Sequence, residues 1–569
     1  MNSKHAFWPR RYPTELTPPA TSLWHNLAVS ALRYPDKPAM VYFGQAWTYT
    51  RFKSACEKLA GHLRRLRVGR GDRVLLDMQN CPQLEIAFYA ILRLDAVVVP
   101  VNPMNKADEL THYIVDADAR VAITTADLCP VFEQANDALA AEQRLRHLVV
   151  THLTDAFDAA RVPEVELPTS WRDWLLAEHP VPAMASIQVH DWSEVLGGPS
   201  PDDLPEVVAG PDDLAVLPYT SGTTGLPKGC MHTHGTMMHS AVNSALWSQG
   251  TPQNVSLGVA PMFHVSGMVS SMHTTIYLGG TQILMPRWNR EVAGHLITKW
   301  GVTHWSNIPT MIIDLLASPR GHEFDLSSLC YIAGGGATMP EAIAQRLLEQ
   351  YGLRYVEGYG LTETASGVHG NPPDAPKSQC LGIPMFGARS LILDQATLAE
   401  VAPGESGEIV IHSPQLFLGY WKNPEATTEA FLEIDGKRYF RSGDIGRVDK
   451  DGYFFMTDRL KRMINASGFK VWPAEVEALM YRHPAIQEVC VVGTKDSYRG
   501  ESVKAFVVLK DPQGRGTRAE DIVGWCREHM AVYKAPSTVE FVDGLPKSSS
   551  GKVLWRTLQD DATAAASPA

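Results

Sequence analysis

A loop rich in small, hydroxyl-bearing residues lies near the middle of the chain, in Tyr219–Gly229 (YTSGTTGLPKG). An apolar run at 214–219 precedes it as an expected buried strand, and 231–247 follows it without proline as an expected helix. In this layout the loop turns backbone N–H groups toward an anion, and glycines and hydroxyl groups favour close contact. The loop is therefore predicted to hold the phosphates of a nucleotide. Its candidate binding residues are Thr220, Ser221, Gly222, Thr223, Thr224, Gly225 and Lys228.

A plain surface loop is the alternative, because clusters of Gly, Ser and Thr are commonly turns without a ligand. A Walker A loop is excluded by spacing, since its lysine directly follows the second glycine of GxxxxGK[ST]. Here Leu226 and Pro227 separate Gly225 from Lys228, and Gly229 stands where Ser or Thr is required. The function of the loop therefore depends on which residues the fold brings to it.

A hydroxyl and a carboxylate stand side by side at Thr362 and Glu363, inside EGYGLTET (357–364). Gly358 and Gly360 indicate a tight loop before them. Mg²⁺ takes oxygen ligands and usually keeps waters and substrate phosphates as well. The oxygen atoms of Thr362 and Glu363 could therefore bind Mg²⁺ together with substrate phosphates. An ordinary turn leading into a capped helix is the alternative.

Two further stretches offer a flat wall and a second carboxylate. Gly335, Gly336 and Ala337 in YIAGGGATMP lack bulk, so a flat ring could lie against their backbone. A strand-to-helix turn needs the same small residues. Asp444 in YFRSGDIG carries a carboxylate that can accept both ribose hydroxyl groups, although an Asp–Ile–Gly turn needs no ligand.

Several basic residues in the C-terminal part of the chain are candidates for contacts with a ligand. Arg459, Lys461 and Lys470 fall in TDRLKRMINASGFKVWPAEVE (457–477), and Lys552 falls in PKSSSGKVLWR. A solvated, charged linker is the alternative for the first group, and a lysine near a terminus is usually solvated.

Taken in order, these motifs resemble those of the adenylate-forming superfamily: acyl-CoA synthetases, coumarate–CoA ligase-like enzymes, firefly luciferase and the adenylation domains of peptide synthetases. The resemblance runs from about residue 22 to 556. It implies an ATP-dependent carboxylic acid–CoA ligase that uses ATP and Mg²⁺, with CoA as co-substrate. It also implies two steps, an acyl-adenylate first and then a thioester, with a small domain rotating between them.

The resemblance assigns roles to individual residues. Lys552 would reach the α-phosphate during adenylation, and Lys461 would be the hinge. The implied catalytic residues are Lys552, Glu363, Thr220, Lys461 and His264, and the implied metal ligands are Thr220 and Glu363. Besides the loop residues above, the implied nucleotide- and cofactor-binding residues are Gly335, Gly336, Ala337, Glu357, Gly358, Tyr359, Gly360, Thr362, Asp444, Arg459, Lys470 and Lys552.

The segment 261–280 (PMFHVSGMVSSMHTTIYLGG) resembles the family motif that walls the acyl group, and it contains no Asp, Glu, Lys or Arg. Amino-acid substrates are disfavoured, because a buried ammonium without a counter-ion is costly. His264 would lie near the substrate carboxylate, or be a satisfied core histidine. The expected pocket residues are His264, Val265, Ser266, Gly267, Met268, Asn307, Pro309 and Val368.

An uncharged pocket favours a medium- or long-chain fatty acid as the substrate. An aryl or cyclic monocarboxylate, of the coumarate, benzoate or cyclohexanecarboxylate type, is the alternative. A ligase that loads acyl-carrier protein is less favoured. An inactive nucleotide-binding relative is least favoured, since Lys552, Glu363 and Asp444 are all present.

The length of 569 residues exceeds what one core supports, about 250–300 residues. Short apolar strands alternating with helices predict an α/β fold with mostly parallel sheets. A composition break near 458–461 predicts a large N-terminal domain and a small α+β domain of its own. The resemblance makes these an adenylation domain at 1–458, a hinge at 459–461 and a mobile lid domain at 462–569. The resemblance adds that the large domain has several subdomains and a distorted β-barrel-like part.

Three segments carry no predicted chemistry. The proline-rich start, 1–22, is expected to be an arm that orders on contact. The stretch 153–212 has weak periodicity and is expected to be a surface insertion. The last eight residues, ATAAASPA, are expected to be disordered.

Composition limits the partners. A net charge of −11 and no long basic run argue against nucleic acid. Eight scattered cysteines without a CxxC pair argue against zinc or a disulfide framework, and favour a reducing, cytoplasmic compartment. Neither a signal peptide nor an apolar run of the ~18 residues of a membrane span is found. A homodimer is expected, and peripheral membrane contact stays open.

Overall fold

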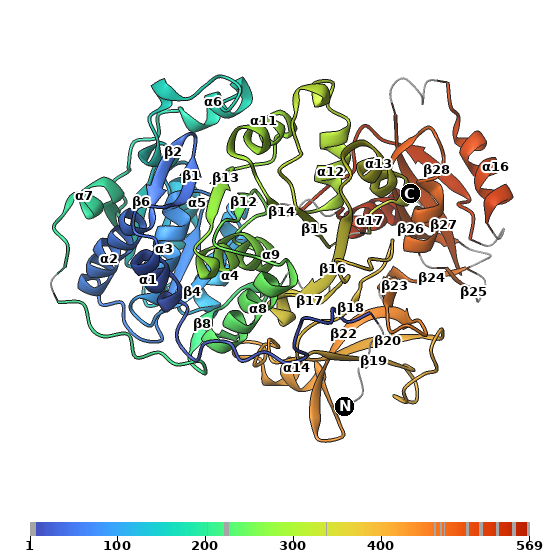
Figure 1. The fold of residues 1–569 in the computed structure, drawn as a ribbon, viewed down its shortest axis with the longest axis horizontal. Helices are drawn as coiled ribbons and strands as arrows, with labels where there is room; N and C mark the ends of the chain where they lie inside the picture. Colours follow the sequence, from blue (N-terminus) through green and yellow to red (C-terminus); the bar gives the residue numbers. More distant parts are fainter. Residues whose placement is uncertain are drawn as a thin grey trace.

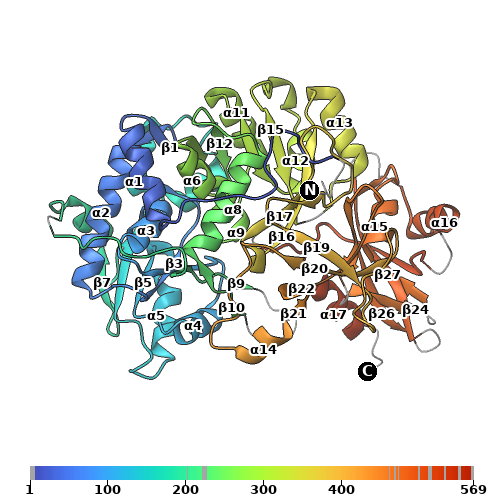
Figure 2. The same cartoon turned by 60° about the horizontal axis from the view of Figure 1, so that its bottom comes forward.

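The fold of the chain is taken from a computed structural model and is built on several sheets (Figure 1, Figure 2). The structure describes residues 7–201, 203–220, 227–336, 338–459, 462–466, 469–471, 473–496, 500–510, 516–530, 534–548 and 553–565.

The first large sheet has seven strands in the order β11-β8-β4-β3-β5-β6-β7, and all neighbours are parallel except β11 with β8. The strands are β3 (Arg73–Asp77), β4 (Val97–Val101), β5 (Val121–Thr125), β6 (His147–Thr151), β7 (Gln188–Asp191), β8 (Leu214–Val216) and β11 (His232–Thr233). β4 is buried at every position, as parallel strands covered on both faces require. The connecting helices are α2 (Tyr49–Arg65), α3 (Pro82–Leu92), α4 (Ala107–Asp116) and α5 (Cys129–Asp137).

The second large sheet has nine strands in the order β18-β17-β16-β15-β14-β12-β13-β1-β2. Its parallel centre ends in antiparallel strands at both edges. The strands are β1 (Pro38–Tyr42), β2 (Gln45–Thr48), β12 (Val255–Gly258), β13 (Thr281–Leu284), β14 (His304–Asn307), β15 (Tyr331–Gly334), β16 (Tyr355–Leu361), β17 (Ser366–Gly370) and β18 (Ile383–Pro384). Its helices include α1 (Trp24–Arg33), α8 (His234–Trp247), α11 (Arg290–Trp300), α12 (Pro309–Leu316) and α13 (Glu341–Tyr351).

A third, antiparallel sheet of five strands curls into a half-barrel. Its strands are β19 (Arg389–Leu393), β20 (Ser406–His412), β21 (Phe431–Ile434), β22 (Lys437–Val448) and β23 (Phe454–Arg459). The ladder shifts register where β22 meets β20 and again where it meets β23. Such bulges increase local twist and bend a sheet. The helix α14 (Pro424–Glu429) precedes β21.

The C-terminal part forms a separate small α+β unit, coloured orange to red in Figure 1. Its five strands are β24 (Ile464–Ala466), β25 (Phe469–Val471), β26 (Ile486–Asp496), β27 (Gly500–Leu509) and β28 (Thr538–Phe541). Its helices are α15 (Pro473–Met480), α16 (Ala519–His529) and α17 (Trp555–Ala565). Side chains such as Val491, Val507 and Ile522 form a buried cluster of its own. The predicted fold class, a large α/β part and a small α+β part, is confirmed.

The prediction for 153–212 as a surface insertion is wrong in part. β7 joins the first sheet as an edge strand parallel to β6. The helices α6 (Thr169–Leu175) and α7 (Trp192–Gly197) bury Trp171 and Trp192 in the main core. The sequence showed only weak periodicity here because these elements are short. The helices have two turns at most and the strand has 4 residues, too few to show a repeat.

The expected disorder of the last eight residues is also wrong where the structure describes them. α17 continues to Ala565, and Ala562 is 4% exposed beside Leu545 and Leu558. Packing against β26 supplies the stabilisation that a short terminal helix lacks in isolation. In the described part of the chain, no helix has the length and apolarity needed to cross a membrane.

One helix of the first core carries a buried acid. Every residue of α3 is buried, and Glu85 on it accepts a hydrogen bond from the Gln282 amide at 2.9 Å. Burial raises the pKa of Glu85 from 4.5 to about 8. The folded protein therefore keeps a proton on Glu85 that the unfolded chain releases above pH 4.5.

We expect this proton to make stability fall with rising pH. Between about pH 4.5 and 8 the folded state binds more protons, so the free energy of unfolding drops by about 1.4 kcal/mol per pH unit for this group. Glu85→Gln removes the proton and keeps the hydrogen bond, so it should raise the melting temperature at pH 8.5 more than at pH 5.5. Glu429→Gln, at an exposed position of α14, should change neither. Equal shifts for Glu85→Gln at both pH values would contradict the prediction.

Candidate functional site

Three parallel strands bring the glycine-rich turns together at one edge of the second sheet. The last residues of β14 and β15, Asn307 and Gly334, are paired in register, and Gly334 is paired with Glu357 of β16. A Cβ atom on Gly335 would lie 2.5 Å from the carbonyl oxygen of Gly358, so only glycine allows the turn after β15 to approach β16. The tight loop expected at Gly358 and Gly360 is wrong, because both residues lie within β16 and pair with β17. Gly336 has a φ of +82°, which also favours glycine. Ligands of α/β folds bind at this carboxyl edge. Ala337 lies outside the described residues.

Glu357 holds the turns rather than facing outward. One carboxylate oxygen accepts the backbone N–H of Gln379 at 2.7 Å, and the other accepts that of Met339 at 3.2 Å. Burial raises the pKa of Glu357 to about 7. This side chain therefore ties the loop after β15 to the segment that follows β17.

Tyr359 and Asp444 meet although 85 positions separate them. The Tyr359 hydroxyl donates to Asp444 Oδ2 at 2.6 Å, and Asp444 is 1% exposed. Asp444 lies in β22 and is paired with Arg459 of β23. Gly360 lets β16 bulge here, because a Cβ atom would lie 1.9 Å from the Ser366 carbonyl oxygen. Three of the predicted nucleotide contacts, Gly358, Tyr359 and Asp444, therefore share one neighbourhood.

Thr362 and Glu363 begin a single helical turn at the end of β16. His232 donates from Nε2 to the Thr362 carbonyl oxygen at 2.7 Å, and burial lowers the pKa of His232 to about 4, so the ring is neutral. The Glu363 carboxylate is 9% exposed and accepts the Tyr420 hydroxyl at 2.8 Å. The carboxylate is thus oriented by a tyrosine from a distant segment.

The candidate phosphate loop is closed by a short antiparallel ladder. β9 (Tyr219–Thr220) pairs with β10 (Lys228–Gly229), so Thr220 stands opposite Lys228. The Tyr219 hydroxyl donates to Asp116 at 2.6 Å and fixes the ladder to α4. The predicted ligands Ser221, Gly222, Thr223, Thr224 and Gly225 lie outside the described residues.

Tyr420 joins the loop to the Glu363 turn, and the sequence analysis missed it. The Lys228 ammonium lies 4.4 Å from the centre of the Tyr420 ring, a distance at which a cation is attracted to the ring face. Its neighbours extend the link: Trp421 donates to the Gly229 carbonyl at 2.8 Å, and Phe417 donates to that of Glu363 at 2.9 Å. No spacing rule connects position 420 with either motif, so only the fold reveals it.

Mg²⁺ fits this arrangement only as a partner of bound phosphates. The structure contains no ligands, and its described residues include no group of three or more His, Cys, Asp or Glu able to hold a metal. Mg²⁺ is commonly bound through one or two carboxylates while phosphates and waters fill the other positions. Glu363, held in place by Tyr420 beside the ladder of the phosphate loop, suits that mode.

The expected acyl-pocket residues divide between two environments. His264 precedes α9 (Val265–Gly267), and Met268 begins a π-helix, Met268–His273. Val265 is buried, Met268 is buried in the main core, Ser266 is exposed, and His264 is half-buried. Gly267 packs so closely that a Cβ atom would lie 2.3 Å from the Pro261 carbonyl oxygen. A π-helix is rare and is frequently found at functional sites.

Val368 does not face the same cluster as Met268. β17 packs against α9, but the Val368 side chain lies with Ile392 and Ile409 of the half-barrel. The alternation of side chains along a strand turns it to that face. The structure therefore places Val368 in the half-barrel cluster and Met268 in the main core.

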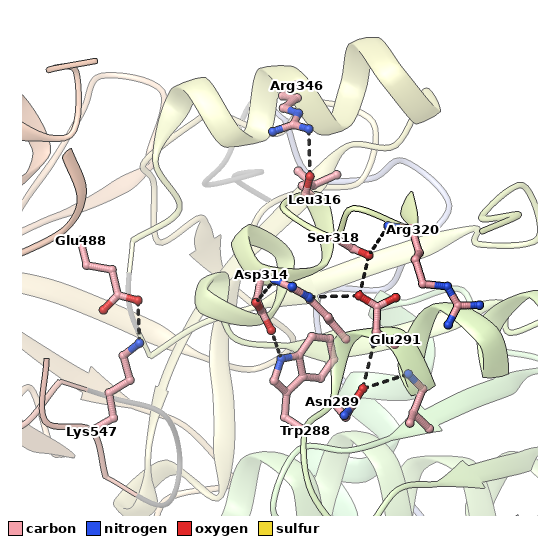
Figure 3. A network of polar contacts seen from close by, with 12 residues as sticks. Trp288, Asn289, Glu291, Asp314, Leu316, Ser318, Arg320, Arg346, Glu488 and Lys547 are labelled. Atoms are coloured by element: carbon pink, nitrogen blue, oxygen red, sulfur yellow. Dashed lines mark hydrogen bonds and ion pairs between the residues drawn. The ribbon is translucent and has the colours of Figure 1, made fainter. Parts of the chain in front are cut away.

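Asn307 and Pro309 flank the start of α12. The Asn307 amide oxygen accepts the Tyr355 hydroxyl at 3.2 Å, and Pro309 occupies the first turn of α12. Figure 3 shows the contacts that fix this helix to its neighbour: Trp288 donates to Asp314 at 2.7 Å, and Ser318 donates to Glu291 of α11 at 2.7 Å. The position of α12 is therefore set by polar contacts remote from the strand edge.

The C-terminal basic residues are only partly visible. Arg459 and Lys470 lie on β23 and β25, and their side chains are not described. Lys461 and Lys552 lie outside the described residues. An antiparallel bridge between Lys547 and Val553 closes the loop that contains Lys552. Lys547 also pairs with Glu488 of β26 at 2.7 Å (Figure 3), so the base of this loop is anchored on the small unit.

Family models match both parts of the chain. A model described as AMP-binding enzyme matches residues 27–421, and one described as AMP-binding enzyme C-terminal domain matches residues 475–552.

Curated proteins and solved structures match along most of the length. A long-chain-fatty-acid–CoA ligase of Bacillus subtilis (strain 168) is 35% identical over 567 residues, covering 98% of both chains. A feruloyl-CoA synthase of Amycolatopsis sp is 35% identical over 522 residues, covering 91% of this chain and 95% of that protein. The crystal structure of the anthranilate CoA ligase AuaEII with anthranoyl-AMP has a TM-score of 0.81 and 26% identity, covering 97% of this chain and 99% of that one.

The buried Asp444 gives a specific test of this site. If its carboxylate accepts the ribose hydroxyl groups, Asp444→Asn should weaken AMP binding about tenfold or more, since a hydrogen bond to a charged group is worth about 1.5–3 kcal/mol. The binding of 2′,3′-dideoxy-AMP, which lacks those hydroxyl groups, should change little. Calorimetric titration of both nucleotides measures the difference.

Tyr359→Phe is the matched control. It removes the hydrogen bond to Asp444 and keeps the carboxylate charge, so it should retain most of the preference for AMP. An unchanged ratio of the two affinities in Asp444→Asn would rule out the ribose contact.

Proposed function

The chain belongs to the family of AMP-binding enzymes and is an AMP-forming acid–thiol ligase, and from this premise we propose that it joins an apolar monocarboxylic acid to coenzyme A by way of an acyl-adenylate. ATP, Mg²⁺ and CoA are its proposed cofactors and co-substrate. The proposed acid is a medium- or long-chain fatty acid.

The proposal depends on one observation. The end of β16 and the helical turn after it link the buried carboxylate Asp444 with the carboxylate Glu363 beside the candidate phosphate loop. Tyr359 reaches Asp444 at one end, and Glu363 reaches Tyr420 and, through that ring, Lys228 at the other. Tyr359 and Glu363 are four positions apart, at most about 14 Å of extended chain. A nucleotide lying along this edge would place its ribose at Asp444 and its phosphates at the Thr220–Lys228 ladder.

In the proposed first half-reaction, a carboxylate oxygen of the acid attacks the α-phosphorus of ATP, and pyrophosphate leaves. Bound Mg²⁺ supplies positive charge to the phosphate oxygens. The residues of this chain position the reactants: Glu363 orients the metal, the Thr220–Lys228 ladder closes the loop around the phosphates, and Gly335 and Gly336 leave room for the adenine ring. Lys552 is the proposed cation that stabilises the charge developing at the α-phosphate.

In the proposed second half-reaction, the CoA thiol attacks the acyl carbonyl carbon and AMP leaves. The small unit must then present a different face, and we place the hinge at 459–461, where β23 ends. Lys470 on β25 is the proposed contact for the incoming thiol substrate. No covalent enzyme nucleophile is needed, which agrees with the absence of a GxSxG motif from the sequence.

The proposal of a fatty acid is supported by two observations. The segment 261–280 is uncharged, and Val265 and Met268 add apolar side chains beside His264. The relative from Bacillus subtilis that matches over 98% of both chains is a long-chain-fatty-acid–CoA ligase. An aryl acid is the second candidate, because the feruloyl-CoA synthase of Amycolatopsis sp has the same sequence identity to this chain, 35%.

A panel of acids decides between these candidates. Pyrophosphate release is measured with short-, medium- and long-chain fatty acids and with ferulate, benzoate and cyclohexanecarboxylate, with and without CoA. We expect the highest kcat/KM with a fatty acid of medium or long chain, and CoA-dependent thioester formation. A preference for an aryl acid of more than tenfold would replace the fatty-acid proposal.

The proposed role of Lys552 predicts that its substitution slows the first half-reaction and spares the second. Lys552→Ala should reduce acid-dependent pyrophosphate release by at least about a hundredfold, because a cation aimed at developing charge is worth several kcal/mol. Thioester formation from supplied acyl-adenylate and CoA should stay within a few-fold of the wild type. Rapid-quench assays of each half-reaction measure both.

Lys547→Ala serves as the control for damage to the loop. It removes the ion pair with Glu488 at the base of the same loop and leaves Lys552 in place. Equal loss of both half-reactions in Lys552→Ala, or equal effects of the two variants, would reject the role of Lys552.

A further inference from the structure

The N-terminal arm, residues 7–22, lies against the back of the nucleotide site. In Figure 1 it runs as a dark blue trace along the lower side of the molecule toward α1. The Trp8 ring meets Phe386 edge-on with centroids 5.5 Å apart and meets Trp247 at 5.6 Å. Tyr12 contacts Phe386 at 5.6 Å, and Thr14 accepts the Gly387 N–H at 2.9 Å. The arm is therefore docked by specific contacts.

The aromatic cluster of Trp8, Tyr12, Trp247 and Phe386 closes over a buried end of α8. Trp247 is 2% exposed and Phe386 is fully buried, and their rings meet edge-on at 5.6 Å. Edge-to-face aromatic pairs are directional, so each ring restricts the orientation of the next. The half-buried Trp8 is the outer member, and without it the Trp247 ring would have room to move.

Trp247 passes this restraint to Asn371. Its indole N–H donates to the Asn371 carbonyl oxygen at 2.9 Å. The space is tight, since a Cβ atom on Gly370 would lie 2.7 Å from the indole nitrogen. A shift of the Trp247 ring would therefore either break this hydrogen bond or move the backbone that follows β17.

Asn371 in turn holds strand β16. Its side-chain amide donates to the Glu357 carbonyl oxygen at 3.0 Å and to that of Cys380 at 2.8 Å. Its backbone N–H also donates to the Glu357 carbonyl, at 3.0 Å. Asn371 is fully buried, so lost hydrogen bonds here would not be replaced by water. Glu357 directly precedes Gly358–Gly360 within β16.

We propose that Trp8 is a positioning residue for nucleotide binding: the arm fixes Trp247, Trp247 fixes Asn371, and Asn371 sets the position of Glu357–Gly360. This proposal rests on the proposed function, which places the nucleotide along that stretch. The arm contributes no group to the nucleotide itself. The arm affects nucleotide affinity only by holding Glu357–Gly360 in the conformation that binds the nucleotide.

The test compares nucleotide affinity with catalysis in the full-length chain. Trp8→Ala is expected to raise the calorimetric Kd for AMP and the KM for ATP about tenfold. The kcat and the KM for the acid are expected to stay within about twofold. Trp8→Phe keeps an aromatic edge and should restore wild-type affinity. Trp247→Phe keeps the ring but removes the donor to Asn371, and should weaken AMP binding as Trp8→Ala does.

Trp171→Ala is the control for a general loss of stability. Trp171 is a buried aromatic of α6, edge-on to Phe43 at 6.1 Å, and α6 lies at the top of Figure 1, away from the arm. It should lower the melting temperature without changing the Kd for AMP.

Two results would overturn this chain of contacts. One is a wild-type Kd for AMP in Trp8→Ala, with only the melting temperature lowered. The other is a parallel fall of kcat and of the affinities for ATP and the acid. If the wild-type protein bound no AMP, the proposed function itself would fail, and the arm proposal with it.

Discussion

The close approach of the turn after β15 to strand β16, at the edge of the second sheet, is the constraint on which the rest of the site depends. Gly335 leaves no room for a side chain against the Gly358 carbonyl oxygen, and Gly360 leaves none beside Ser366. Parallel pairing of β15 with β16 places these residues next to one another, and their lack of side chains leaves a wall of main chain. Every other group of the site is arranged relative to this wall.

Charged groups around the wall are held by neutral partners. Tyr359 orients Asp444, Tyr420 orients Glu363 and lies under Lys228, and backbone N–H groups hold Glu357. Hydroxyl and amide donors fix the direction in which a carboxylate points. Asp444 and Glu363 are thereby oriented as the proposed binding of sugar hydroxyl groups and a cation requires.

Much of the fold could be predicted because its signals are local. The segment 97–101 (VVVPV) is a continuous apolar run and 121–125 (VAITT) is rich in β-branched residues, and the structure has β4 and β5 at those residues. The elements between 153 and 212 escaped because a two-turn helix or a four-residue strand shows no period. The helical end of α17 escaped because contacts with β26, distant in the chain, stabilise it. The separation of Val368 from Met268 likewise depends on which face of β17 packs against the half-barrel.

The sequence by itself determined the chemistry: which residues carry carboxylates, hydroxyl groups and glycines, and in which order their motifs follow, since side-chain type and spacing are properties of the chain alone. The tertiary structure decided which of them meet. Tyr420 lies beside Lys228 and Glu363, and Trp8 packs on Trp247, because sheet pairing and packing bring together segments that are far apart in the chain. Contacts between distant segments leave no pattern in the local sequence, so no spacing rule could predict them.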